Sequence, residues 1–488
     1  MGDPEGPEEL YFNGINGATG DYLLPPLSVE AVSNVAAGES LDEQELAELQ
    51  ARVSAITGTY LGVVDGVDAT KLAEAGWGVV YPHDVDPAVQ EALKPLLEHR
   101  REQAAAVKEE RYREFSGPEA HRPGERSSDF LVRHGIAPGM PVDPDKTPYY
   151  MLLVGDPERI PYRFQYQLDV TFAVGRIHFD SPEEYARYAE SVVRAEKTPM
   201  PSRDVVLFGV RNEDDKATTM SADQLVGQLA EPLSTKFGDW SFQSLAGGDW
   251  SFRSLIGKDQ ATKGKLDELV HGGGPPRLLF TASHGMAFPN GDSRQEAHQG
   301  ALLCQDWPGP MQWHGAISQD HYFSADDVRD EADVGGMLAI FFACYGAGTP
   351  KTDDFAQQAL GAPAQIAPHA FVGRLPQRLL GHPKGGALAV VGHVERAWSY
   401  SFMWPQIGRQ LQIFESTMGS LLRGIPLGQA VEYFNDHYAA LTTELETLKE
   451  DIQFGATANP AEVSGLWTAK NDARNYVILG DPAVRLTA

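Results

Sequence analysis

The chain has 488 residues, about three average domains in length, and its 42% hydrophobic content is ample for a packed core. The 40 basic and 68 acidic residues give a net charge of −28, which repels phosphate backbones and argues against a nucleic-acid partner. Two cysteines cannot build a disulfide framework, and no stretch approaches the ~18 consecutive apolar residues of a membrane span.

The N-terminal region, residues 1–145, has a mixed character. Residues 1–40 are rich in Gly, Pro and Asn and are typical of loops, and residues 77–81 (WGVVY) predict a strand. Residues 86–113 predict a long charged helix. The polar segment 116–128 predicts a linker or mobile loop.

The first nine residues lack the basic and apolar segments of a secretory signal, so we expect a cytoplasmic, reducing setting. The cysteines and histidines lack metal-ligand spacing, so no metal or other cofactor is expected.

From residue 148 the pattern becomes regular. Short apolar runs alternate with helical stretches, which predicts a mostly parallel sheet covered on both faces, a three-layer α/β/α sandwich. Ser181 begins one of the helices, with Pro182 and Glu184 in its first turn. The expected strands are 149–154, 172–177, 204–210, 277–283, 337–343 and 386–391.

A tandem decapeptide interrupts this region. Residues 238–247 (GDWSFQSLAG) are followed at once by the similar residues 248–257 (GDWSFRSLIG). Two copies are too few for a solenoid, so a duplicated strand or a hairpin extension is expected.

Two of the expected strands end in residues that suit nucleophilic catalysis. The run 277–283 ends in His284-Gly285, and the run 337–343 ends in Cys344, which a small-residue loop follows. Ligands bind beyond the carboxyl ends of parallel strands, so we expect the imidazole and the thiol in one crevice.

The chemistry follows from these groups. An imidazole can take the proton of a thiol and later protonate a leaving amine. The amides of Gly285 and Cys344 are natural donors to a developing oxyanion. Taken alone, however, a Cys at a strand end is more often a small buried hydrophobe.

Six motifs in order resemble the gingipain-type branch of caspase-fold (clan CD) cysteine peptidases. They are LLVGD at 152–156, VGRI at 174–177 with SPEE at 181–184, ASHG at 282–285, AC at 343–344, GALAVVG at 386–392 and VILGDPAV at 477–484. The resemblance covers residues 146–488, as a first sub-domain at 146–260 and a catalytic sub-domain at 261–488. Residues 1–145 do not match it and are interpreted as a separate region, with a regulatory role as a hypothesis.

The resemblance implies that Cys344 is the nucleophile and His284 the general acid/base. It also implies a carboxylate after the strand 204–210 that assists the histidine. Glu213 is the nearest match, with Asp214 and Asp215 as rivals.

Substrate contacts are likewise implied by the resemblance. Trp398 matches a pocket-lining tryptophan, and Asp223 falls near the acidic residue of the S1 pocket in basic-specific members. Asp353 and Asp354 are other acidic candidates, and Tyr345 is a further candidate contact in the nucleophile loop.

The expected function is a regulated intracellular cysteine endopeptidase that acts on proteins or peptides through an acyl-enzyme and prefers Arg or Lys at P1. An acidic P1 would require Arg211 or Arg396 in the pocket. An activating partner or self-cleavage within 116–128 is a further hypothesis. A catalytically silent scaffold and a Cys-dependent acyl transferase stay open as alternatives.

Overall fold

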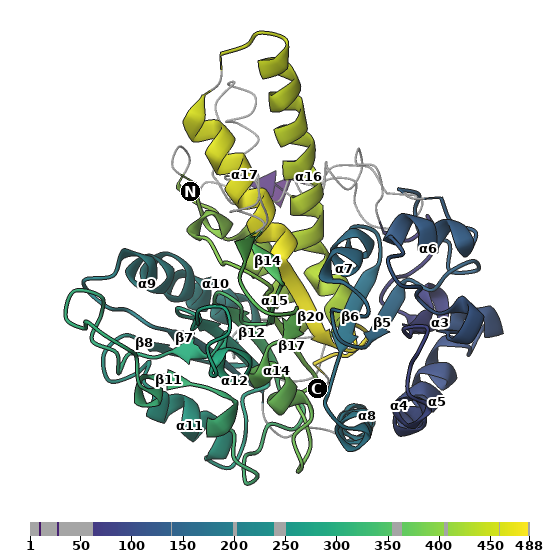
Figure 1. Ribbon diagram of the computed structural model, residues 1–488, viewed down its shortest axis with the longest axis horizontal. Helices are drawn as coiled ribbons and strands as arrows, with labels where there is room; N and C mark the ends of the chain where they lie inside the picture. Colours follow the sequence, from purple (N-terminus) through teal and green to yellow (C-terminus); the bar gives the residue numbers. More distant parts are fainter. Residues whose placement is uncertain are drawn as a thin grey trace, which may run out of the picture.

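The computed structural model describes residues 9–10, 27–28, 62–137, 139–198, 203–238, 250–353, 364–404, 408–457 and 459–486. These residues form a ten-stranded sheet with helices on both faces (Figure 1). The expected α/β class with a mostly parallel sheet is confirmed. None of the helices in the described ranges combines the length and apolar character of a membrane span.

The strand order of the sheet is β4-β3-β5-β6-β20-β17-β12-β9-β7-β8. In that order the strands are Tyr112–Phe115, Trp77–Val80, Tyr150–Val154, Ala173–Ile177, Tyr476–Gly480, Ala389–His393, Leu338–Phe342, Leu278–Ala282, Asp204–Gly209 and Ser251–Ile256. Within the described residues, β17 and β20 form the one antiparallel pair of this sheet. All its other pairs are parallel.

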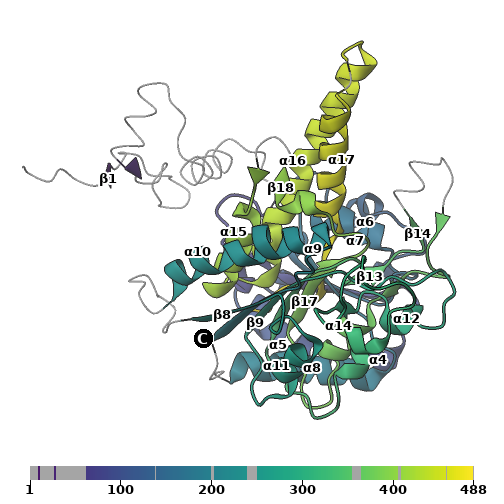
Figure 2. The ribbon, with the colours of Figure 1, turned by 90° about the vertical axis from the view of Figure 1, so that its left-hand side faces the viewer.

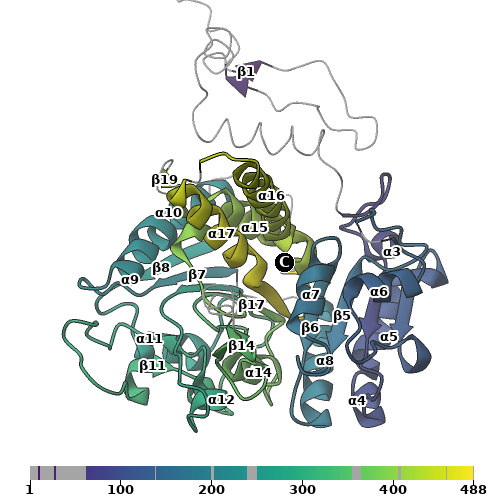
Figure 3. The ribbon, with the colours of Figure 1, turned by 45° about the horizontal axis from the view of Figure 1, so that its top comes forward.

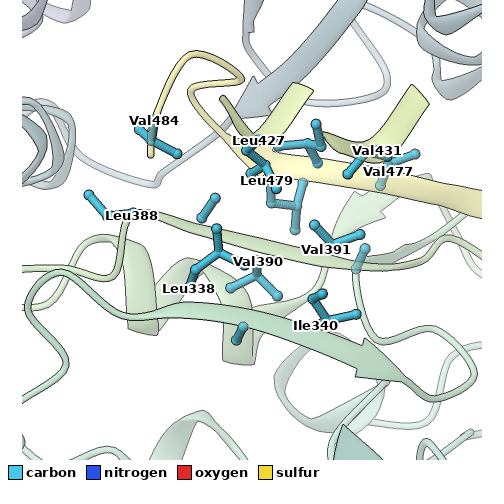
Figure 4. Close-up of a cluster of buried hydrophobic side chains, with 14 of the residues drawn as sticks. Leu338, Ile340, Leu388, Val390, Val391, Leu427, Val431, Val477, Leu479 and Val484 are labelled. Carbon is cyan, nitrogen blue, oxygen red and sulfur yellow. The ribbon is translucent and has the colours of Figure 1, made fainter. Parts of the chain in front are cut away.

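The central strands are buried because helices cover both of their faces. Each residue of β5, β6, β9, β12, β17 and β20 is buried, which explains why these segments are almost continuous apolar runs. Figure 4 shows Leu338, Val390 and Leu479 from three neighbouring strands packed together, with Val431 of α16 (Leu427–Gln453) close by.

The helices form two layers. One face carries α7, α10, α15 and the base of α16, and the other carries α5, α8, α11 and α14 (Figures 2 and 3). The helices not yet bounded are α3 Leu72–Ala75, α4 Pro87–Ala92, α5 Lys94–Ala104, α6 Ser127–Arg133, α7 Tyr162–Asp169, α8 Pro182–Lys197, α9 Lys216–Ser221, α10 Gly227–Phe237, α11 Lys263–His271, α12 Gln295–His298, α14 Arg374–Leu380, α15 Gln412–Leu422 and α17 Pro460–Asn475. α16 and α17 pair as a hairpin that projects from the body (Figure 1).

The single long helix expected in the N-terminal region is wrong. The long helix expected over 86–113 is two helices, α4 and α5, followed by the edge strand β4. The helix is interrupted at Leu93, and Pro95 lies in the first turn of the next one, where its missing N–H is tolerated. β3 and β4, from the N-terminal region, belong to the main sheet, where β3 pairs with β5. The domain boundary expected at residue 145 stays a prediction.

The segment 116–128 is also not a free linker. It contains a 3₁₀ turn at Gly117–Glu119, and the buried His121 exchanges backbone hydrogen bonds with the segment that follows β3. Arg133 of α6 binds the carbonyl of Ala120 and the carboxylate of Glu125. These contacts hold the segment against the body.

A buried ionic network joins the two ends of the chain. Arg100 of α5 donates to Asp481 at 2.6 Å and to Glu196 of α8, and the Trp77 indole also donates to Asp481. Arg100 is 1% exposed and Asp481 is fully buried, so each charge depends on its partner. The C-terminal residues thereby stabilise the N-terminal strands.

The second copy of the decapeptide supplies the edge strand β8, which pairs in parallel with β7. Most of the first copy lies outside the described residues, so a duplicated strand stays a prediction.

Candidate active site

The ends of β9 and β12 bring His284 and Cys344 to the same edge of the sheet. Ala282 of β9 pairs with Phe342 of β12, and each strand ends two residues before its functional side chain. The amide of Ser283 donates to the carbonyl of Phe342 at 3.2 Å, so the register continues past the strands. A Cβ on Gly285 would overlap the carbonyl oxygen of Cys344, which shows how closely the two backbones approach.

Cys344 lies in a tight turn. The amide of Gly346 donates to the carbonyl of Ala343 at 3.2 Å, and Tyr345 has a φ of 59°. A left-handed conformation is unfavourable for a bulky residue and persists only where the surroundings enforce it. The carbonyl of Glu395 holds the Tyr345 amide at 2.6 Å, and this contact fixes the turn that presents the thiol.

The thiol of Cys344 contacts the segment that follows β17. The amide of Ala397 donates to Sγ at 3.4 Å, and Sγ lies 3.9 Å from the carbonyl oxygen of Ala397. Burial raises the pKa of Cys344, while the Ala397 amide lowers it, and the net effect is a raised pKa. The thiol is therefore protonated at neutral pH and needs a base to become a nucleophile.

The imidazole of His284 is paired with a carboxylate. Nε2 of His284 lies 2.7 Å from Oδ2 of Asp215. If Nε2 carries the proton that Asp215 accepts, Nδ1 of the neutral ring has a free lone pair. The His284 side chain is 38% exposed, so the ring is partly accessible from solvent.

Asp215 is positioned by the start of α9. Its carboxylate accepts from the amide of Ala217 at 3.1 Å and from the hydroxyl of Thr218 at 2.8 Å. Burial alone would raise the pKa of Asp215, but the hydrogen bonds from His284, from Thr218 and from the Ala217 amide lower it to about 2. The group is an anion throughout the neutral range.

The assignment of Glu213 as the assisting carboxylate is wrong, because Asp215 makes the contact and Glu213 is exposed. The N-cap preference of Asp, with Thr218 three residues later, is the signal that could have selected Asp215 from its rivals. The position of Glu213 soon after the end of β7 did not by itself identify the carboxylate that contacts His284.

Trp307 packs against the histidine and was not identified from the sequence. Its ring lies edge-on to the imidazole of His284, with centroids 6.2 Å apart. Asn212 donates to the carbonyl of Trp307 at 2.5 Å. Asn212 follows β7, as Asp215 does, so one loop fixes both the carboxylate and the aromatic neighbour of His284.

The two proposed oxyanion donors are available. In the described part of the chain, neither the Gly285 amide nor the Cys344 amide donates to a backbone carbonyl. Both lie at the carboxyl edge of the sheet, beside the thiol. Their positions suit the stabilisation of negative charge on a substrate oxygen.

An ionic cluster lies next to the thiol. Arg396 makes a bidentate pair with Asp353, at 2.9 and 2.5 Å, and also donates to Glu395 at 2.8 Å. The hydrogen bond that Arg396 donates to Asp353 raises the pKa of Arg396, so the guanidinium stays charged. Asp353 and Glu395 are buried, and the three charges sum to −1. Asp354 lies outside the described residues.

The other predicted substrate contacts are placed as follows. Asp223 is ion-paired with Arg211 at 2.9 Å. Trp398 follows Ala397, and its amide donates to the buried Asp472 at 2.6 Å. Tyr345 is 7% exposed, and burial raises the pKa of its hydroxyl to about 12.

Cys304 differs from Cys344 in its surroundings. It is fully buried, its thiol donates to the carbonyl of Leu302 at 3.3 Å, and burial raises its pKa strongly. Both cysteines are free thiols. Among the described residues, no group of three or more His, Cys, Asp or Glu side chains is arranged to hold a metal ion.

No family model and no curated protein matches the chain. A solved structure described as a protease is similar over 84% of this chain and 78% of its own chain, at 13% identity and a TM-score of 0.44. Two structures of the Saccharomyces cerevisiae separase–securin complex match 68% of this chain, at 11% identity and TM-scores of 0.28 and 0.26. This chain spans only 15% and 16% of the matched chains in those complexes. At TM-scores below 0.5 these likenesses carry no information about activity, and the gingipain-type resemblance stays a prediction.

Proposed function

We propose that the chain is a cysteine endopeptidase with Cys344 as nucleophile, His284 as general acid/base and Asp215 as the residue that orients the histidine. The observation that carries the proposal is the contact between the Cys344 and His284-Gly285 backbones at the ends of β12 and β9. The Asp215 carboxylate on Nε2 of His284 completes the arrangement. A nucleophile, a base and a group that orients the base are the parts that acyl transfer requires.

The reaction would proceed in two halves. Nδ1 of His284 takes the thiol proton as Sγ attacks the carbonyl carbon of the scissile peptide. The imidazolium then gives that proton to the leaving amine, and an acyl-enzyme thioester forms on Cys344. In the second half, His284 takes a proton from water, hydroxide attacks the thioester, and the thiol regains its proton. The amides of Gly285 and Cys344 would stabilise the oxyanion of both tetrahedral intermediates.

The P1 preference that we propose is Arg or Lys. The cluster of Asp353, Glu395 and Arg396 has two carboxylates and one guanidinium, and Glu395 and Arg396 directly precede Ala397, whose amide contacts the thiol. A cationic P1 side chain is attracted to such a cluster, while an acidic one is repelled by it. Substrates would be proteins or peptides in a cytoplasmic setting, which two free thiols favour.

A covalent peptide probe tests the proposal. The full chain is incubated with peptidyl acyloxymethyl ketones that carry Arg, Asp or Leu at P1, and each adduct is located by mass spectrometry after digestion. We expect the Arg probe to label Cys344 fastest and Cys304 not at all. His284→Ala should abolish labelling by the peptide probe. Equal labelling of both cysteines, or labelling that His284→Ala leaves unchanged, would refute the catalytic assignment.

A further inference from the structure

The two halves of the sheet repeat one topology. The second half contains β7, β8, β9, β12 and β17 in chain order, and the first half contains β3, β4, β5, β6 and β20. If the strands of each half are numbered in chain order, their spatial order from the centre of the sheet outward is fifth, fourth, third, first and second in both halves. Because β17 and β20 are antiparallel, the carboxyl ends of the first half lie on the edge of the sheet opposite to Cys344.

This repeat relates the candidate active site to a second position in the molecule. His284 and Cys344 lie two residues beyond β9 and β12, and the corresponding residues beyond β5 and β6 are Asp156 and Phe179. Neither is a thiol or an imidazole. The nearby hydroxyl of Ser181 is hydrogen-bonded to Glu184 in the capping box of α8. His178, next to Phe179, brings an imidazole to this position, but the described residues that line it include no thiol. The second position therefore lacks a cysteine nucleophile and is suited to binding rather than to bond cleavage.

A pocket of about 250 Å³ occupies this second position. It is lined by residues that follow β3, β5 and β6 and by the first turns of α4 and α8. From β3 the chain continues to β4 on one side and then returns to β5 on the other side of β3. Open α/β sheets place ligand crevices at such switch points of the strand order. Pro82, Val85 and Val89 contribute apolar wall.

The polar groups of the pocket are mainly acceptors. Asp86 uses Oδ1 to cap α4, and Asp156 uses Oδ1 to accept the amides of Glu158 and Arg159. Asp180 uses Oδ2 to bind Arg374. Within the described residues, the second oxygen of each carboxylate accepts no hydrogen bond.

Among the described residues, Arg159 is the one Arg or Lys side chain that lines the pocket. His178 also lines it, and burial lowers the pKa of its imidazole, so the ring is neutral at pH 7. The Arg159 guanidinium lies 3.6 Å from Asp156 and 3.6 Å from Asp84, beyond hydrogen-bond distance of either. With Asp84 and Arg374, which pair with lining residues, four carboxylates face two guanidinium groups, so the region is net anionic. A ligand for this pocket must therefore bring N–H donors and positive charge.

We propose that this pocket binds a guanidinium or ammonium group on a short aliphatic stem, as in arginine or lysine. The carboxylate oxygens would accept charge-assisted hydrogen bonds from the cationic head. The apolar wall of Pro82, Val85 and Val89 would pack against the methylene stem. The ligand is either the free amino acid or the side chain of a bound polypeptide. The pocket lies at the edge of the sheet opposite to Cys344, so ligand binding there does not require the proposed catalytic residues.

The test uses the full chain with Cys344→Ala, so that no substrate is turned over. Isothermal titration compares L-arginine with L-citrulline, which has a similar shape but no charge, and with the blocked peptide acetyl-Gly-Arg-Gly-amide. We expect arginine to bind at least about tenfold more tightly than citrulline, since the charge-assisted bonds are lost. Tighter binding of the peptide than of arginine would identify a polypeptide side chain as the ligand, and the reverse would identify the free amino acid.

Variants locate the binding. Asp156→Asn with Asp180→Asn should weaken arginine binding at least about tenfold, and Val89→Trp, which fills the pocket without changing a charge, should also weaken it. Asp451→Asn, an exposed carboxylate near the end of α16, should have no effect. Absence of arginine binding, equal affinity for citrulline, or binding that both pocket variants leave unchanged would overturn the proposal.

Discussion

Asp215 binds Nε2 of His284 at 2.7 Å while the same carboxylate caps the helix α9 through the amide of Ala217. The orientation of the imidazole is thereby tied to the start of a helix. The hydroxyl of Thr218 adds a third contact to this carboxylate, which leaves it little freedom to rotate away from the histidine.

Asp215→Asn should lower kcat/KM by about 10²- to 10⁴-fold, because the amide cannot stabilise an imidazolium and no longer fixes the tautomer. Peptide hydrolysis by purified variants measures this effect. Glu213→Gln is the matched control, and its activity should stay within about twofold of the wild type, since Glu213 is exposed. A larger loss in Glu213→Gln than in Asp215→Asn would reverse the assignment.

The pH dependence of alkylation at Cys344 follows from its raised pKa. The reactive thiolate is a minor species below that pKa, and its fraction grows about tenfold per pH unit. We therefore expect the rate of alkylation by iodoacetamide to rise steadily from pH 6.5 to pH 8.5, as measured by mass spectrometry of the Cys344 peptide. A rate that is already constant at pH 7 would indicate a preformed thiolate–imidazolium pair instead.

Gly285→Ala should abolish activity and lower the free energy of unfolding by about 3 kcal/mol, because the new methyl group would overlap the Cys344 carbonyl and the two strands must separate. Gly274→Ala is the control, since a Cβ there meets open space in an ordinary backbone conformation. Thermal unfolding and peptide hydrolysis measure the two effects. Full activity in Gly285→Ala would mean that the Cys344 carbonyl lies farther from Gly285 than it does in this structure.

Asp481→Ala should destabilise the fold by about 3–5 kcal/mol, since it leaves the buried guanidinium of Arg100 with one carboxylate partner and removes the acceptor of Trp77. Asp145→Ala, which removes an exposed carboxylate paired with Lys108 and Arg111, should cost less than about 1 kcal/mol. Urea unfolding of both variants makes the comparison. Equal losses would show that the buried network adds nothing beyond a surface ion pair.

The sequence was sufficient to locate the main strands of the sheet. Strands such as β9 and β12 are buried on both faces, so they stand out as continuous apolar runs. The edge strand β4 was missed because its central residues, Arg113 and Glu114, face solvent and continue the charge pattern of the preceding helix. The union of β3 and β4 with the main sheet also depends on pairing between distant segments, which local patterns do not encode.

The candidate site was predictable to a similar degree. His284 and Cys344 could be predicted from the ends of two apolar runs, because adjacent parallel strands place the residues that follow them at the same edge of the sheet. To choose among Glu213, Asp214 and Asp215, one must know at which residue α9 begins, because its N-cap residue is the one that contacts His284. The ion pair of Arg396 with Asp353 required two loops to meet, and the sequence alone had offered the two residues as rival specificity groups.

Cleavage of a peptide mixture varied at P1, by the wild type and by Cys344→Ala, tests the central claim most directly. Mass spectrometry of every product reports both activity and specificity. The account predicts cleavage after Arg and Lys by the wild type, and none by Cys344→Ala. Cleavage that persists in Cys344→Ala would contradict the assignment of the nucleophile, and cleavage after Asp or Glu would contradict the proposed P1 preference.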